Sequence, residues 1–111
     1  MNTKAGEIVS FPLTVKKGEL FEISVLVRHD MESGFRHDEH GRRIARNIIR
    51  EFTCKYNDVE IFKAVIHPGI SANPYFLFSC RAVDSGTLEF WWIGDNHFSR
   101  LSKHQLLVSK P

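Results

Sequence analysis

The histidines are the side chains of this sequence whose positions most suggest metal binding or proton transfer. His29 directly follows one apolar stretch and His67 directly follows another, so both are expected where strands meet loops, at one end of the fold. A neutral imidazole can ligate a metal or move a proton near neutral pH. A single histidine at a strand end is more often a hydrogen-bonded fixture, and neither one has a catalytic partner at a recognisable spacing.

The second chemical candidate is the run His37-Asp38-Glu39-His40, "HDEH", which could hold a divalent metal ion from a loop. A structural zinc site needs four ligands in a defined geometry, and no partner set with recognisable spacing occurs elsewhere in the chain. We therefore favour a solvated loop over a metal site, and we expect no cofactor.

The segment "HPGISANPYFLFSC" (67–80) combines a histidine with two prolines. Pro68-Gly69 predicts a type II turn, because proline fixes φ at the first corner and glycine supplies a positive φ at the second. His67 precedes a proline, which pushes it toward extended geometry. These features predict a rigid connection between two strands.

The same segment ends by entering a strand. Asn73 also precedes a proline and is expected to be extended, and Pro74 suits the first residue of a strand because its missing N–H costs little there. Tyr75 follows it, at a position similar to that of the corner tyrosine of immunoglobulin-like folds, whose hydroxyl ties a loop back to a strand.

The two cysteines show no redox or zinc motif. Cys54 and Cys80 form no Cys-X-X-Cys pair and have no histidine at zinc spacing. Two buried, reduced thiols or one intrachain disulfide both remain open. The chain also lacks a Gly-X-Ser-X-Gly elbow, a phosphate-binding loop and a dinucleotide fingerprint, so nothing in it supports an enzyme.

Composition predicts one folded domain over residues 1–111. Hydrophobic residues make up 42% of the chain, with nine Phe and two Trp. The net charge of +2 gives no preference for nucleic acid, and no stretch approaches the length of a transmembrane helix. The first residues lack the apolar core of a secretory signal, which by itself predicts a cytoplasmic protein.

The elements that must position these residues are strands, because the hydrophobic period is two. In residues 20–29 the side chains of Phe21, Ile23, Val25 and Val27 share one face. Similar runs occur near 7–15, 48–56, 59–66, 74–83, 87–93 and 98–109. About seven short strands with turn signals between them predict an all-β fold, an immunoglobulin-like antiparallel β-sandwich.

Three local features refine this arrangement. Arg50 interrupts the alternation of 48–56, which indicates a bulge, and Asn57-Asp58 predicts a tight hairpin turn. Residues 30–46 hold four acidic residues, four arginines and two histidines, and do not read as a strand. A loop this long in a small sandwich is either functional or simply mobile and solvated.

One strand is expected to expose large apolar side chains. If Leu88, Phe90 and Trp92 face the core, Trp91 and Ile93 must lie on the outer face, as Leu26 does on its own strand. Exposed tryptophan is enriched at protein interfaces. This face is a candidate interface unless another part of the chain covers it.

Several ordered motifs resemble those of one known family. They are "KGELFEISVLVRHDMESGFR", "FTCKYND", "IFKAVIHPGISANPYFLF" and "SGTLEFWW", together covering about residues 17–93. The chain is similar to the SoxZ proteins of the bacterial thiosulfate-oxidising (Sox) system. The family's usual "HPMETG" stands here as "HDMESG", with Asp30 for Pro and Ser33 for Thr.

The resemblance implies a non-enzymatic subunit with an immunoglobulin-like fold. SoxZ proteins pair with SoxY, whose sulfur-bearing cysteine sits on a flexible C-terminal arm, and the SoxYZ heterodimer presents bound sulfur intermediates to the other Sox enzymes. The implied location is the periplasm, reached with a signal-bearing partner, which replaces the cytoplasmic expectation. Partner contacts are then expected at His29, Met31, Glu32, Gly34, His67, Trp91 and Ile93, with structural roles for Pro68, Gly69, Asn73, Pro74 and Tyr75.

The residues agree with this role on one point. A carrier cysteine must be exposed, but Cys54 and Cys80 fall inside predicted strands and the end "LLVSKP" contains no cysteine.

Two alternatives to a sulfur-carrier subunit remain. A mononuclear iron protein of the superoxide-reductase kind needs about four His and one Cys, and this chain has no Cys-X-X-His pair. A generic adhesion or domain-linking sandwich would bind no sulfur carrier.

Overall fold

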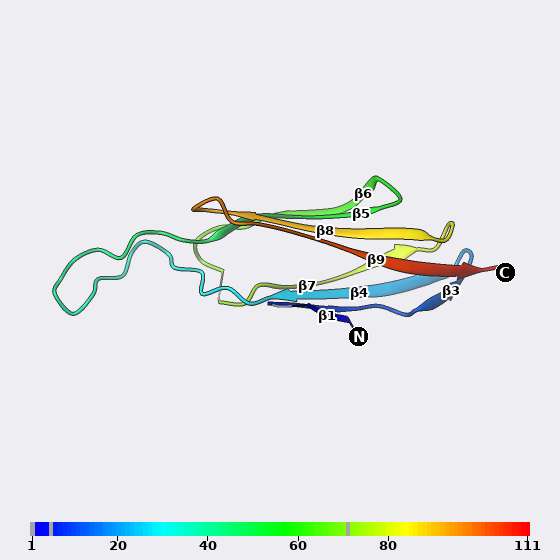
Figure 1. Cartoon of the computed structure of the whole chain (residues 1–111), viewed down its shortest axis with the longest axis horizontal. Coiled ribbons are helices and arrows are strands. Elements are labelled where there is room, and N and C mark those ends of the chain that lie inside the picture. The colour runs from blue at the N-terminus through cyan, green and yellow to red at the C-terminus, as the bar shows by residue number, and fades with distance from the viewer. Residues whose placement is uncertain (1, 5, 71) are drawn as a thin grey trace.

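The computed structural model describes residues 2–4, 6–70 and 72–111. These residues form nine strands: β1 (Asn2–Lys4), β2 (Glu7–Ser10), β3 (Thr14–Lys16), β4 (Leu20–Val27), β5 (Ile49–Tyr56), β6 (Val59–Val65), β7 (Tyr75–Arg81), β8 (Gly86–Gly94) and β9 (Ser99–Ser109). One sheet has the order β1-β2-β4-β7 and the other β3-β9-β8-β5-β6. The sheets lie face to face, with their strands along the long axis of the molecule (Figure 1).

Alternation of side chains explains the sandwich. Phe21, Ile23, Val25 and Val27 of β4 are all buried, and Leu88, Phe90 and Trp92 of β8 are fully buried from the opposite sheet. The predicted fold class, an immunoglobulin-like β-sandwich, is confirmed. Over the described residues, no helix is long and apolar enough to span a bilayer.

The start of the chain is more divided than the sequence predicted. The single strand expected near 7–15 is two strands, β2 in the four-stranded sheet and β3 in the five-stranded sheet. Pro12 lies in the connection, where its missing N–H costs no ladder bond. β3 runs parallel to β9, whereas the other strand pairs of the described residues are antiparallel. With β1 added, the described strands exceed the predicted seven by two.

Two local predictions in the second sheet are confirmed. The register between β5 and β8 shifts between Ile49 and Glu51, which places a bulge at Arg50. Asn57 and Asp58 both have positive φ, 48° and 66°, as a type I′ hairpin turn requires. The turn joins β5 to β6.

Aromatic side chains fill the space between the sheets. Phe52 of β5 lies 4.3 Å from Trp92 and 5.4 Å from Phe76, measured between ring centroids, and Phe62 stacks on Phe78 at 4.3 Å. Because β6 and β7 are both edge strands, Phe62, Phe76 and Phe78 are only half-buried. The core is therefore fully buried at its centre and partly exposed along this side.

A carboxylate crosses the core. Glu7 of β2 is 1% exposed. Its Oε2 accepts a hydrogen bond from Trp92 Nε1 at 2.8 Å, and its Oε1 accepts one from Ser102 Oγ at 2.6 Å. Both donors belong to the other sheet, so this side chain joins the two layers through hydrogen bonds. Nothing in the sequence pattern of β2 singled it out.

Both cysteines are free thiols on the inner faces of their strands. Cys54 is fully buried and Cys80 is half-buried. Burial raises the pKa of Cys54 to about 12, with a smaller contribution from Cys80, and burial also raises the pKa of Cys80. Of the two possibilities left open, the structure contains the reduced pair rather than the disulfide.

The segment 67–80 departs from prediction at its turn. Ile70 N donates to His67 O at 3.1 Å, so a turn forms where expected. Gly69, however, does not have the positive φ of a type II turn. Proline at the first corner fits types I and II equally, and glycine accepts either sign of φ, so the sequence did not distinguish them. The type II prediction was wrong.

Two further predictions in this segment were wrong. Asn73 has φ 57° rather than an extended conformation, because its main chain and side chain both bond to His29, and Asn tolerates this left-handed geometry. Tyr75 is 56% exposed on the outer face of β7. The hydroxyl that ties a loop back belongs to Tyr56, which accepts from Val83 N at 3.0 Å and donates to Asp84 O. Pro74 does lead directly into β7, as predicted.

The long segment after β4 projects from the sandwich as an arm. Residues 30–47, defined here as the arm, leave one end of the two sheets and return to it (Figure 1). The molecule measures 62 × 22 × 20 Å along its principal axes, and the arm accounts for much of the greatest length. Its two limbs meet at the isolated bridges Glu32–Asn47 and His37–Arg43, so it is an irregular hairpin rather than a shapeless loop.

Candidate partner-docking site

The arm is anchored to the core by Met31. This residue has a positive φ of 54°, which turns the chain so that its side chain is buried, 6% exposed. Its sulfur accepts a hydrogen bond from Ile49 N at 3.3 Å, at the start of β5. Met31 was predicted as a partner contact, and its burial makes it an internal anchor of the arm.

Gly34 allows the two limbs of the arm to approach. Its φ is 89°, and a Cβ built on it would lie 2.9 Å from the Cβ of Arg46 on the opposite limb. Ser33 Oγ accepts from Phe35 N at 3.2 Å, closing a local turn. Gly34, like Met31, was expected at a partner surface, and the structure gives it a local backbone role.

The limbs are held together by main-chain bonds. Glu32 and Asn47 exchange two, at 2.9 and 2.8 Å, and Ile44 N donates to Arg36 O at 2.9 Å. The Glu32 carboxylate accepts a bidentate hydrogen bond from the Arg36 guanidinium, which lowers the pKa of Glu32. Phe35, which stands between Glu32 and Arg36 in the sequence, is 73% exposed. The sequence did not identify Phe35 as a candidate contact.

His29 holds the root of the arm to the loop before β7. Its N–H donates to Asn73 Oδ1 at 2.9 Å, and its carbonyl accepts from Asn73 N at 2.7 Å. Its Nδ1 accepts from Met31 N at 3.0 Å, so the proton of the neutral ring is on Nε2. Burial lowers the pKa of His29, against the opposing effect of the Asp30 and Asp95 carboxylates.

Asp95 fixes the returning limb. Its carboxylate accepts from Ile48 N at 3.1 Å and from Arg46 at 2.9 Å, and Arg50 lies 3.3 Å away. Burial raises the pKa of Asp95, but these hydrogen bonds and charges outweigh it, and the net pKa is lowered. The sequence indicated this residue only as part of a turn.

The predicted contacts therefore fall into separate groups. The root cluster, His29, Met31 and Asn73, lies next to Glu32 and Gly34 in the arm. His67 is exposed in its own turn, where its carbonyl accepts from Ile70 N, and lies outside the root cluster. Around the root a shallow hollow of about 560 Å³ is lined by Arg28, His29, Asp30, Asn47, Asn73 and Phe98.

The tip of the arm does not gather metal ligands. Asp38 Oδ1 accepts from the main-chain N–H groups of His40 and Arg42, both at 2.9 Å, so it caps the turn. His37 and His40 are exposed. Across residues 2–4, 6–70 and 72–111, no three side chains of His, Cys, Asp or Glu are arranged to hold a metal ion.

Trp91 and Ile93 lie on the outer face of the five-stranded sheet. Trp91 is 42% exposed, and its Nε1 donates to Ser99 Oγ at 3.0 Å. Beside it a hollow of about 150 Å³ is lined by Thr53, Lys55, Glu89 and Leu101. Ile93 is half-buried. The outward placement of Trp91 is as the alternation predicted.

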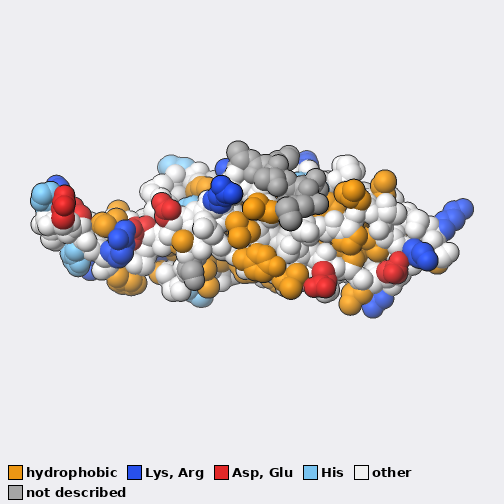
Figure 2. Space-filling view, turned by 90° about the horizontal axis from the view of Figure 1, so that it is seen from below, with side chains coloured by type: hydrophobic (Ala, Val, Ile, Leu, Met, Phe, Trp, Pro, Cys, Tyr) orange, Lys and Arg blue, Asp and Glu red, His pale blue; other side chains and the backbone are white. Residues whose placement is uncertain are grey.

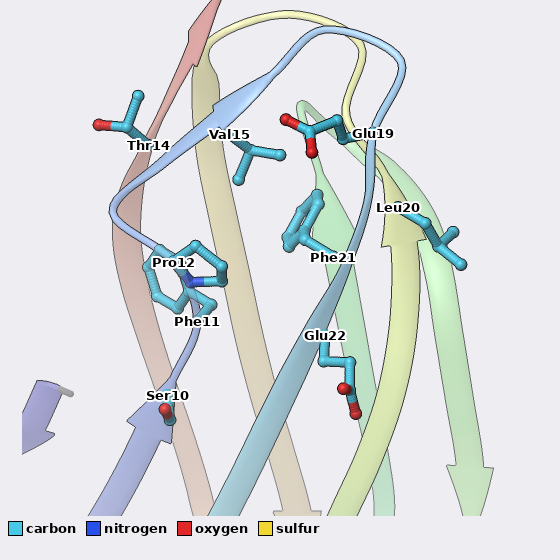
Figure 3. A pocket seen from close by; sticks show the side chains of 9 residues that line it. All are labelled: Ser10, Phe11, Pro12, Thr14, Val15, Glu19, Leu20, Phe21 and Glu22. Atoms are coloured by element: carbon cyan, nitrogen blue, oxygen red, sulfur yellow. The ribbon is translucent and has the colours of Figure 1, made fainter.

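A further hollow, of about 580 Å³, opens where the chain changes sheets (Figure 3). It lies between the segment from Ser10 to Val15 and the start of β4, with Phe21 and Val15 directed into it. Its carboxylates are Glu19 and Glu22, and Glu19 Oε1 already accepts from Lys16 N at 3.0 Å. The hollow is a consequence of the strand switch.

The fold is similar to those of two kinds of protein of known structure. The superoxide reductase (neelaredoxin) of Ignicoccus hospitalis superposes with a TM-score of 0.69 and 17% identity, over 93% of this chain and 80% of that chain. The sulfur carrier protein SoxY of Chlorobium limicola f thiosulfatophilum superposes with a TM-score of 0.66 and 8% identity, over 96% of this chain and 81% of that chain. Both likenesses show the fold alone. No curated protein matches the sequence.

Fold and site define a small immunoglobulin-like sandwich with a rooted, projecting arm and an exposed tryptophan on one outer face. Residues 9–105 match the family described as sulphur oxidation protein SoxZ. The chain belongs to the SoxZ family, as the sequence motifs indicated, and membership implies a role in Sox sulfur oxidation.

Proposed function

We propose that this protein is the non-catalytic subunit of a sulfur-carrier heterodimer, in which it binds and orients a SoxY-type carrier. The carrier's cysteine holds the covalent sulfur intermediates of thiosulfate oxidation, and this chain supplies the scaffold and a surface for the other Sox enzymes. Family membership over residues 9–105 supports the pathway.

The observation that carries the scaffold role is the placement of the thiols. Cys54 is fully buried with a pKa of about 12, and Cys80 is half-buried with a raised pKa. A carrier thiol must reach several active sites and react as a thiolate. Cys54 is enclosed in the core, and the raised pKa of Cys80 lowers its thiolate fraction at neutral pH. Covalent sulfur is therefore assigned to the partner.

Two exposed features are available for contacts with the carrier or the enzymes. The arm presents Phe35 on a backbone held at both ends, and the outer sheet face presents Trp91 beside a hollow. A preorganised surface loses less conformational entropy on binding than a mobile loop does. We assign Trp91 and Ile93 to the carrier, and His67 with the arm to the enzymes.

We place the heterodimer in the periplasm, exported with a partner that bears the signal. The experiment is co-expression with a SoxY-type carrier, followed by size-exclusion chromatography and fractionation. Co-elution and joint recovery from the periplasm are expected, whereas separate elution at micromolar concentration contradicts the proposal. A generic adhesion sandwich would not bind the carrier.

The thiols provide the matched control. Cys54→Ser and Cys80→Ser are expected to leave sulfur loading of the heterodimer intact, as mass spectrometry of the intact subunits would show. Loss of loading by either variant while it remains folded would assign the sulfur to this chain instead.

A further inference from the structure

β7 is an edge strand with no strand on its outer side in the described part of the chain. It pairs with β4 alone, antiparallel from Leu26–Tyr75 to Leu20–Arg81. At its start Val27 N donates to Pro74 O at 3.1 Å. This bond establishes which main-chain groups of β7 point toward β4.

The ladder alternates from that point. Phe76, Phe78 and Cys80 stand opposite Val25, Ile23 and Phe21, and their N–H and C=O groups face β4. The main-chain groups of the intervening residues therefore face outward. Those residues are Tyr75, Leu77, Ser79 and Arg81.

This edge lacks the usual protection against strand pairing. Between Tyr75 and Cys80 it has no charged side chain and no proline. The other long edge, β6, carries Glu60 and Lys63 and faces a bulge at Cys54/Lys55. The remaining edges, β1 and β3, have three residues each. Of the described edges, β7 is the one open to another strand.

An apolar patch adjoins the open edge. Ile8, Leu26 and Tyr75 form a continuous row across three strands, and Leu77, opposite Ser24, is the next residue of β7 on the same face. Tyr75 and Leu77 are each 56% exposed. Seen from the side of β1, β4 and β7, hydrophobic side chains gather on this face (Figure 2). The strand and its face thus offer main-chain and apolar contacts together.

We propose that β7 pairs antiparallel with β7 of a second copy of this chain, about a two-fold axis at Phe78, and joins two four-stranded sheets into one. This register uses the outward main-chain groups of all four residues. It places Leu77 opposite Ser79 of the second copy. Such an interface is isologous, since each copy contributes the same surface.

The charges of the strand fit this partner. Arg81 is the only charged residue of β7, and its Nη1 donates to Gly18 O at 2.6 Å within the monomer. In this register it stands opposite Tyr75 of the second copy rather than opposite a second Arg81. Two opposed guanidinium groups would repel, and this register avoids placing them opposite each other. The strand is self-complementary, and the proposal does not depend on binding of a sulfur carrier.

The experiment is sedimentation equilibrium of the full chain from micromolar to millimolar concentration. Wild type is expected to dimerise, and Leu77→Lys is expected to weaken the dimer at least about tenfold, because it places two lysines at the new seam. Ser79→Pro removes an outward N–H that the monomer does not use in its ladder, and should have the same effect. Circular dichroism verifies that each variant is folded. If Ser79→Pro does not fold, the result for Leu77→Lys alone tests the proposal.

Leu101→Lys is the matched control, because Leu101 is 53% exposed on the outer face of the other sheet. It is expected to leave the dimer unchanged. A wild type that stays monomeric throughout overturns the proposal. So does a dimer that Leu101→Lys disrupts while Leu77→Lys and Ser79→Pro leave it intact.

Discussion

Single residues in the motif by which the family is recognised turn out to build the arm. Met31 adopts a left-handed conformation and buries its thioether against Ile49. Gly34 has a positive φ, and a Cβ at this position would come too close to the side chain of Arg46. Ser33 supplies a hydroxyl that Thr would also supply, so the change from the family pattern keeps the local turn. Residues that look like contacts in a sequence can instead be the supports of a contact surface.

Gly34→Ala is expected to loosen the arm. The left-handed φ costs about 1–3 kcal/mol for a residue with a side chain, and the Cβ of Arg46 would have to move as well. Amide hydrogen exchange at Glu32 and Asn47 should accelerate by about tenfold or more. Gly41→Ala is the control, since Gly41 also has positive φ (78°) but open space around it. Equal effects of the two changes would rule out the close approach as a cause.

Trp91→Ala is expected to weaken the heterodimer by about 2 kcal/mol or more, as truncation of a buried interface tryptophan does. Isothermal titration of the folded variant with a SoxY-type carrier measures this. Tyr75→Ala, on the opposite outer face and 56% exposed, should bind the carrier as wild type does. Loss of binding by Tyr75→Ala alone would assign the carrier to the other sheet.

At the scale of elements, alternation predicted the strands well because one face of each is buried. It located the bulge at Arg50 and the hairpin at Asn57, where the local signals are strong. It did not predict the arm's hairpin form, because the two limbs pair through isolated main-chain bridges that no hydrophobic pattern marks. The bonds of Asn73 and Asp95 were missed because they join segments far apart in the chain.

The root of the arm is expected to respond to pH. His29 has a pKa below the ordinary value of 6.5 because it is partly buried, so the folded state favours the neutral ring. Its contribution is complete above pH 6.5 and is lost as the pH falls from there through the folded pKa, since a protonated Nδ1 cannot accept from Met31 N. The Met31 amide signal followed by NMR should shift over that range.

His29→Asn keeps a side-chain acceptor near the root but has no group that titrates there. Its Met31 amide should show no comparable shift between neutral and mildly acidic pH. A shift that persists in this variant would point to Asp30 or Asp95 as the titrating group.

At the scale of the whole molecule, the sheets are joined by more than apolar contact. Glu7 lies between them with both oxygens hydrogen-bonded to the other sheet. The sequence placed this residue in a first strand but could not predict its burial, because the strand was expected to be continuous to residue 15. The switch between β2 and β3 sets which residues of that region reach the core.

Glu7→Ala is expected to lower the free energy of unfolding by about 2 kcal/mol or more, because it leaves two buried donors without an acceptor and removes packed atoms. Urea denaturation measures the change. Ser102→Ala removes only one of the two bonds and should cost about 1 kcal/mol. If Glu7→Ala lowers the free energy of unfolding no more than Ser102→Ala does, the hydrogen bonds of the carboxylate do not stabilise the packing of the two sheets.

The parallel pair of β3 and β9 also determines when the molecule can fold. Thr14 pairs with Leu107, so β3 cannot join its sheet until β9, which is far away in the sequence, has reached it. Contacts this distant in sequence slow folding, because the chain loses conformational entropy in closing the loop before the contacts can stabilise it. Until β9 arrives, β8 has a partner only in β5. The five-stranded sheet is therefore completed only when β9 has joined both β8 and β3.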